Sequence, residues 1–256
     1  MILRSPSATG GFTPALGLNI SGGGDLDAGD LSGASKYFYR VVRVSTDDSS
    51  IGVTNSETYA VYKQTRVPGT SYIVGVPVDY VGNDRTLGGP LGTQLATGLS
   101  PNDRLTVFPP QATYKLGGGG AWGGASAVIL APGMGVMIEH TGGVASASTV
   151  LAGILPTNNV AAVTMAKGYN IVAWPYETPG NGLAAFSGLT SSTGTNGDYI
   201  IFQNVTNATT IARWTPTGWM TGTRPGSGSS FNPTLQPGAG IMIYRQSDGG
   251  QWAPLP

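Results

Sequence analysis

The stretch Leu130–Ile138 reads Leu-Ala-Pro-Gly-Met-Gly-Val-Met-Ile, and it returns as Leu-Gln-Pro-Gly-Ala-Gly-Ile-Met-Ile at Leu235–Ile243. Proline restricts φ and glycine permits positive φ, so each copy predicts a sharp turn that leads into a buried strand. Each copy also follows an aspartate that stands just before an apolar run, at Asp103 and at Asp198. The chain therefore repeats one β unit, and what repeats is turn and strand residues.

The second glycine of each copy, Gly135 or Gly240, has two structural explanations. It can serve the turn itself, because glycine tolerates conformations that other residues avoid. It can instead leave room for a bulky neighbour, with Trp122 and Trp219 as the candidates. Both explanations concern packing and involve no reaction chemistry.

Strand patterns run through the whole chain, whereas helix patterns are nearly absent. No long window carries apolar residues at helical spacing. Val160–Ala166 is short enough for one helical turn, and its β-branched residues suit a strand equally well. Glycine- and serine-rich turns separate the strands at a spacing of about 10 residues, which is typical of sandwiches and barrels. We expect an all-β fold with two tandem homologous sandwich- or barrel-like units.

The repeats divide the chain into three segments. The first is a glycine-rich N-terminal arm that carries one strong strand, which includes Tyr37, Tyr39 and Val41. A first β repeat and a second β repeat follow. In order, the three segments cover residues 1–48, 49–143 and 144–256.

The composition excludes several classes of protein. Hydrophobic residues make up 40% of the chain, which argues against disorder. Charged residues make up 10%, against about 25% in a typical soluble domain, and the formal net charge is zero. A chain without a basic surface is not expected to bind nucleic acid. It contains no cysteine, hence no disulfide or thiolate site, and no apolar run of membrane-spanning length.

Residues for catalysis are scarce. His140 is the single histidine, and no Gly-x-Ser-x-Gly turn accompanies it. Asp103 and Asp198 recur between the repeats, but an aspartate just before a strand usually bonds nearby backbone N–H groups. We therefore expect no enzymatic activity.

One segment has a partial metal-binding pattern. Asp25, Asp27 and Asp30 follow three glycines and resemble half of a calcium loop. The closing acidic residue is missing, because position 35 is serine, so a flexible polar linker is the alternative explanation. Calcium is the single cofactor candidate.

Tryptophans suggest a contact surface in the second repeat. Trp122 and Trp219 occupy corresponding places in the two repeats and are expected to fill the cores. Trp174 and Trp214 have no aromatic counterparts in the first repeat, and they are the candidates for stacking on a polysaccharide.

Several of these motifs together resemble a group of secreted bacterial β proteins of unassigned function. The resemblance covers about the last 190 residues of the chain. It rests on Tyr169–Pro175, Gly197–Ile200, the tryptophan pair, Leu235–Gly240 and Trp252. It implies export, with a signal peptide that would precede Met1, and it implies no catalytic residues. The segment Tyr37–Val44 separately resembles one strand of fibronectin type III modules.

Low charge, few reactive groups and a duplicated unit favour a structural protein. We expect a self-assembling, secreted or cell-surface subunit of a filament or layer, held by apolar and β-edge contacts between copies. The strand with Tyr37, Tyr39 and Val41 is the candidate for addition to a neighbouring sheet. A carbohydrate-binding or adhesive module is the alternative, and an enzyme is a third, weaker one.

Overall fold

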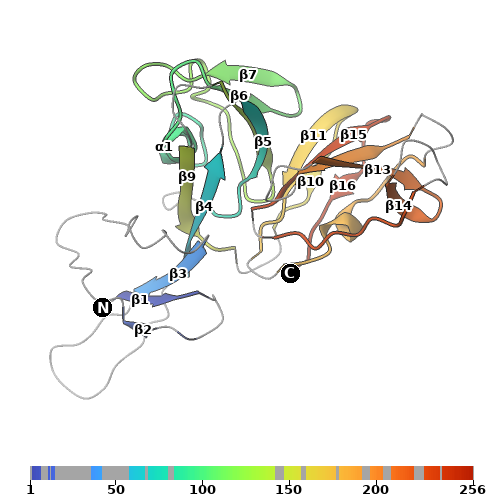
Figure 1. The fold of residues 1–256 in the computed structure, drawn as a ribbon, viewed down its shortest axis with the longest axis horizontal. Helices are drawn as coiled ribbons and strands as arrows, with labels where there is room; N and C mark the ends of the chain where they lie inside the picture. Colours follow the sequence, from blue (N-terminus) through green and yellow to red (C-terminus); the bar gives the residue numbers. More distant parts are fainter. Residues whose placement is uncertain are drawn as a thin grey trace.

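The computed structural model confirms an all-β fold: among the residues that it describes, strands dominate and one short α-helix interrupts them. The strands form four antiparallel sheets within the described chain, and Figure 1 shows the N-terminal sheet at lower left, the first repeat above it and the second repeat to the right. The structure describes residues 2–6, 11, 13–14, 36–41, 58–66, 69–79, 84–141, 147–156, 160–176, 179–191, 197–203, 209–221, 228–236 and 238–255.

Each repeat is built around one sheet, and the first four strands of the two sheets follow the same order. The first-repeat sheet runs β5 (Thr70–Gly75), β8 (Gly135–His140), β6 (Arg104–Val107) and β7 (Ala112–Lys115). The second-repeat sheet runs β11 (Gly168–Ala173), β15 (Gly240–Arg245), β12 (Tyr199–Gln203), β13 (Thr209–Thr215) and β14 (Gly218–Thr221). In both sheets the strand after the Pro-Gly turn lies between the first two strands of its unit, as duplication predicts.

The first strand of each repeat segment belongs, together with the strands of the arm, to a third sheet. This N-terminal sheet runs β2 (Thr13–Pro14), β1 (Ile2–Ser5), β3 (Lys36–Val41), β4 (Tyr59–Arg66) and β9 (Ala147–Ile154). β4 and β9 pair with one another along their whole lengths. The start of each repeat segment is therefore joined to the arm.

The arm strand β3 is not free. β3 pairs with β1 on one side and with β4 on the other, so both of its edges are occupied within the chain. Addition of the strand that carries Tyr37, Tyr39 and Val41 to a neighbour's sheet is not open in this arrangement. The physical reason is that Phe38 is fully buried in the first-repeat core, which holds the strand in its own chain.

The first core lies between the first-repeat sheet and the β4–β9 part of the N-terminal sheet. Its members come from β3, β4, β9, β5, β8 and the helix, among them Phe38, Tyr62, Leu151, Val74, Ile138 and Leu95. Gln94 joins the helix to the edge of β9. Its amide Nε2 donates to Ala152 O at 3.2 Å, and its Oε1 accepts from Ala152 N at 3.0 Å.

The α-helix, α1 (Pro90–Ala96), is an element that the sequence pattern does not predict. Pro90 at its first turn has a suitable φ and needs no N–H partner there. Leu91 and Leu95, one turn apart, are both buried in the first core. The segment Val160–Ala166, in contrast, contains the short strand β10 (Val163–Thr164).

The second core is rich in tryptophan. Trp174, Trp219 and Trp252 are all buried in it, and β10 pairs there with β16 (Gln251–Trp252). Trp252 Nε1 donates a hydrogen bond of 3.0 Å to Gly182 O, which lies in the 3₁₀-helix η2 (Gly182–Ala185). A Cβ at Gly180 would lie 2.2 Å from the Trp174 ring, so glycine is required for this close packing.

The two repeat sheets pack against each other through their outer faces. The apolar cluster between them contains Ile73, Phe108 and Met137 from the first repeat and Ile171, Ile201 and Met242 from the second. Val136 and Ile138 face the first core, whereas Met137 between them faces the other repeat. Both faces of β8 are covered along Gly135–Ile138, which explains why this part of its sequence is apolar without alternation.

Two glycines make the close approach of the sheets sterically feasible. A Cβ at Gly135 would lie 2.6 Å from Ile171 Cγ2, and a Cβ at Gly240 would lie 2.4 Å from Ile73 Cγ2. Each glycine therefore leaves room for an isoleucine of the other repeat. The contact occurs twice, with the roles of the two repeats exchanged.

The tryptophan explanation of these two glycines is wrong, because Trp122 and Trp219 lie inside their own cores. They are 5% and 6% exposed, which confirms their expected role as core residues. Trp122 Nε1 donates to Gly92 O of α1 at 2.9 Å.

Backbone hydrogen bonds between the repeats are reciprocal as well. Gly75 N donates to Gly238 O at 3.1 Å, and Ala173 N donates to Gly133 O at 2.8 Å. Gly75 and Ala173 end equivalent strands, and Gly133 and Gly238 belong to the two copies of the Pro-Gly turn. The repeats thus meet as two copies do around a two-fold axis.

Candidate functional site

The recurring aspartates lie at equivalent places and are completely buried. Asp103 precedes β6 and Asp198 precedes β12, and both are 0% exposed. Asp103 Oδ2 accepts from Ser100 N at 2.8 Å, and Asp198 Oδ2 accepts from Thr190 N at 2.8 Å. Each carboxylate thus bonds the backbone of the turn before its strand, as the sequence pattern indicates.

In the first repeat the buried carboxylate meets the single histidine. His140 Nδ1 lies 2.7 Å from Asp103 Oδ2, and both side chains are 0% exposed. Thr141 donates to Asp103 Oδ1 from its backbone N and from its hydroxyl, both at 2.8 Å. An ionised carboxylate only accepts, so Nδ1 carries the ring proton in this contact. His140 Nε2 is buried and has no hydrogen-bond partner among the described residues.

These contacts act on the acidity of Asp103. Burial by itself raises the pKa of a carboxyl group, but hydrogen bonds from Ser100, Thr141 and His140 together lower the pKa of Asp103 below its ordinary value. The group therefore stays ionised in the folded protein at neutral pH.

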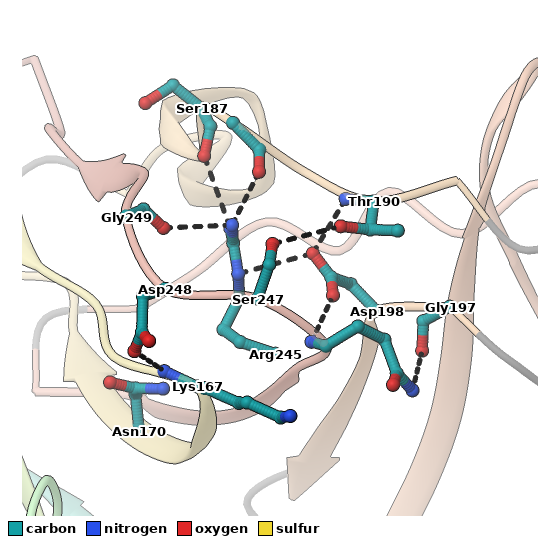
Figure 2. A network of polar contacts seen from close by, with 12 residues as sticks. Lys167, Asn170, Ser187, Thr190, Gly197, Asp198, Arg245, Ser247, Asp248 and Gly249 are labelled. Atoms are coloured by element: carbon teal, nitrogen blue, oxygen red, sulfur yellow. Dashed lines mark hydrogen bonds and ion pairs between the residues drawn. The ribbon is translucent and has the colours of Figure 1, made fainter.

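In the second repeat the partner is an arginine (Figure 2). Arg245 Nε lies 3.2 Å from Asp198 Oδ2 as an ion pair that lacks hydrogen-bond alignment, and both side chains are 0% exposed. The guanidinium also donates to Ser187 O at 3.2 Å, to Gly249 O at 2.9 Å and to Gly188 O. Asp198 Oδ1 accepts from Gln246 N at 2.8 Å.

His140 and Arg245 occupy the same place in their sheets. His140 ends β8 opposite Thr70, the first residue of β5, and Arg245 ends β15 opposite Gly168, the first residue of β11. We call the two pairs the Asp–His clamp and the Asp–Arg clamp. Each joins the end of one strand to the start of another, and solvent has no access to either pair.

The candidates for sugar stacking lie in or against the second core. Trp174 is 3% exposed and belongs to the core cluster, so neither face of its ring is open. Trp214 is half-buried and packs edge-on against Trp219, with ring centroids 5.4 Å apart. The structure does not bring Trp174 and Trp214 together as a flat exposed platform.

A row of tyrosines lies on the outer face of the second-repeat sheet. Tyr169, Tyr244 and Tyr199 are directly opposite one another on β11, β15 and β12. Their ring centroids are 4.9 Å apart for Tyr169 and Tyr244, and 5.1 Å apart for the stacked pair Tyr199 and Tyr244. The Tyr169 and Tyr199 hydroxyls lie 2.9 Å apart. Burial, together with the bond to Tyr169, raises the pKa of Tyr199, so its phenol stays neutral.

The tyrosine row and the arginine partner of Asp198 are residues that sequence reasoning misses. A signal was available, because Tyr169, Tyr199 and Tyr244 fall on strands that the repeat alignment already places in one sheet. The alignment also sets Arg245 against His140.

The calcium candidates Asp25, Asp27 and Asp30 lie outside the described residues. Within the described chain there is no cluster of three or more acidic, histidine or cysteine side chains suited to a metal ion. Among the residues that the structure describes, no helix has the length and apolar character needed to cross a membrane. This chain matches no protein-family model, no curated protein and no solved structure.

Proposed function

We propose that this protein is a structural, self-associating subunit of an extracellular filament or surface layer, without enzymatic activity. The observation that carries the proposal is that two copies of one β unit already bind each other within the chain. They do so through the outer faces of their sheets, with Gly135 against Ile171 and Gly240 against Ile73. A unit that binds its own duplicate through such reciprocal contacts is suited to bind further copies.

The buried polar groups support a structural role. Both clamps are buried, and each joins the end of one strand to the start of another. They are the pairs Asp103–His140 and Asp198–Arg245. One clamp uses a histidine and the other an arginine, although these side chains differ in acid–base chemistry. A role that tolerates either side chain is better explained by packing than by proton transfer.

Sheet faces are better candidates for the contacts between subunits than the β5 edge of the first-repeat sheet. The edge strand β5 is covered by Gln203 of the second repeat, whose Nε2 donates to Ser71 O at 2.9 Å and whose Oε1 accepts from Ile73 N at 3.0 Å. An edge whose N–H and C=O groups are occupied resists addition of another strand. Apolar face contacts, worth about 25 cal/mol per Å² of buried area, then provide the cohesion.

Sedimentation velocity and electron microscopy of the purified protein over a wide concentration range test this function. We expect assemblies that grow with protein concentration, and whose extent changes little between low and high salt because charged residues are only 10% of the chain. A monodisperse monomer at the highest concentration would refute the proposal.

A carbohydrate-binding or adhesive role is the second candidate, and the tyrosine row favours it. Tyr169 is 37% exposed, so part of an aromatic surface is accessible to a ligand. This candidate predicts that soluble polysaccharide changes the intrinsic fluorescence of the protein in a saturable manner. Unchanged fluorescence, together with no retention on insoluble polysaccharides, would exclude it.

A further inference from the structure

We infer that a second copy of this chain binds the outer face of the second-repeat sheet, an inference that rests on the proposed self-association. The surface, which we call the outer patch, extends from the tyrosine row to the exposed side of β13 and β14. Ile211, which lies on β13 one row away from the tyrosines and opposite Ile201, is 48% exposed. The outer patch consists of Tyr169, Tyr199, Ile211, Arg213, Met220 and Tyr244.

The first repeat provides an internal comparison for this surface. Its sheet has the same strand order, so each position of the outer patch on the shared strands has an equivalent residue. Ile211, opposite Ile201, corresponds to Thr113, opposite Thr106. In the same way, Ser71 corresponds to Tyr169, Glu139 to Tyr244, Arg104 to Tyr199, and Lys115 to Arg213.

The equivalent face of the first repeat is thus an ordinary solvated surface. Arg104 and Glu139 form an ion pair at 3.6 Å with about half of each side chain exposed, and Lys115 and Thr113 are exposed beside them. The second repeat has the same backbone but carries tyrosine and isoleucine there. The first repeat forms this sheet with polar residues at these positions, so folding does not require apolar ones. The apolar residues of the second repeat therefore indicate a binding surface.

The occupant follows from continuity with the contact between the repeats. The outer patch continues the same face of the second-repeat sheet that binds the first-repeat sheet, and Phe108 of the first repeat reaches Tyr169, with centroids 6.2 Å apart. This face therefore already recognises another copy of its own sheet. A second chain presents the same face, so two outer patches can meet around a two-fold axis.

The composition of the outer patch suits such a contact. Arg213 lies over the Tyr199 ring with its Cζ 5.5 Å from the centroid, and the same pairing is available between chains. Tyrosine, methionine and arginine are enriched in protein interfaces. The formal net charge of zero imposes no repulsion between two copies.

A sugar ligand fits the outer patch less well. Stacking on a pyranose requires an open ring face, but Tyr199 and Tyr244 stack on one another at an interplanar angle of 16°. Ile211 adds branched aliphatic surface, which suits a protein partner. A second copy of this chain is the occupant that these features favour.

The test compares two equivalent substitutions, Ile211→Glu in the outer patch and Thr113→Glu at the matching position of the first repeat. Sedimentation velocity over a range of concentrations measures association, and thermal unfolding verifies the fold. We expect Ile211→Glu to raise the concentration needed for association by about tenfold or more, because it replaces an exposed apolar side chain of the interface with a charge. Thr113→Glu should leave association unchanged. Ile211→Thr, which installs the first-repeat residue, provides a milder variant should the glutamate disturb folding.

The possible results separate this inference from the proposed function. If the wild type and both folded variants associate equally, the inference is overturned and self-association stands on another surface. If the wild type is monomeric at every concentration, both are overturned. If a monomeric wild type binds polysaccharide and Ile211→Glu abolishes that binding, the outer patch is a sugar site and the inference is likewise overturned.

Discussion

The two repeats hold the same buried carboxylate with different partners. Asp103 meets a histidine and three other hydrogen bonds, whereas Asp198 meets an arginine whose guanidinium also binds backbone carbonyls. The comparison teaches that the strand-end geometry, and not the acid–base chemistry, is what both repeats retain. It also predicts that the two clamps differ in strength.

The largest expected effect is the loss of Arg245. Arg245→Met removes the charged partner of the buried Asp198, to which the backbone N–H groups of Thr190 and Gln246 still donate, and this should lower the free energy of unfolding by about 3–5 kcal/mol. His140→Leu in the first repeat should cost less, about 1–3 kcal/mol, because Asp103 keeps its bonds from Ser100 and Thr141. Urea denaturation of both variants measures the difference, and a larger loss for His140→Leu would contradict the ranking.

The reciprocal glycine contacts come next. Gly240→Ala should lower the free energy of unfolding by about 1–3 kcal/mol, since the added Cβ would lie 2.4 Å from Ile73 Cγ2. In a double-mutant cycle with Ile73→Ala, the two losses should not add, because the smaller side chain relieves the clash. Ile171→Ala, which enlarges the space beside the other glycine, is the matched control and should give additive losses. Additivity in both cycles would show that the two sheets are not packed in this way.

The Asp–His clamp should make the stability of the protein depend on pH in the acid range. The pKa of Asp103 is lower in the folded protein than in the unfolded chain, so its contribution to stability is complete above the ordinary aspartate pKa of about 3.9. That contribution disappears as the pH falls through the lowered pKa. We expect the urea midpoint to decline over this acid range, and Asp103→Asn to flatten the decline. An unchanged slope in the variant would assign the acid sensitivity to other carboxylates.

The smallest expected effect is on the solvated outer face of the first repeat. Glu139→Gln removes an exposed ion pair with Arg104 and should change the free energy of unfolding by no more than about 1 kcal/mol. Tyr244→Ala, at the equivalent position of the second repeat, should cost more, because each of its ring pairs contributes about 0.5–1.5 kcal/mol. Thermal unfolding compares them, and equal losses would contradict the proposed difference between the two faces.

Much of the architecture was predictable because turns and strands depend on neighbouring residues. The Leu-x-Pro-Gly-x-Gly copies, the aspartates before β6 and β12, and the core tryptophans Trp122 and Trp219 all lie where the pattern indicates. Helix α1 is not predicted by the sequence because it is only 7 residues long and contains a glycine, Gly92, so its helical pattern is weak. Leu91 and Leu95 stabilise it only once they pack in the first core.

The candidate site was less predictable, since its contacts join distant parts of the chain. Asp198 finds Arg245 because β12 and β15 are neighbours in one sheet, although 46 residues separate them in the sequence. Trp174 is an apolar ring in a strand-end segment, and nothing local distinguishes a buried ring from an exposed one.

Local patterns alone were sufficient to establish that one β unit occurs twice, with turns at its prolines and glycines, because backbone preferences act over a few residues. Long-range packing decided the rest: that β3 is enclosed, that Gly135 and Gly240 receive isoleucines from the opposite repeat, and that one outer face stays apolar. Such outcomes depend on which surfaces exclude water together, and that becomes defined only when distant strands have come into contact.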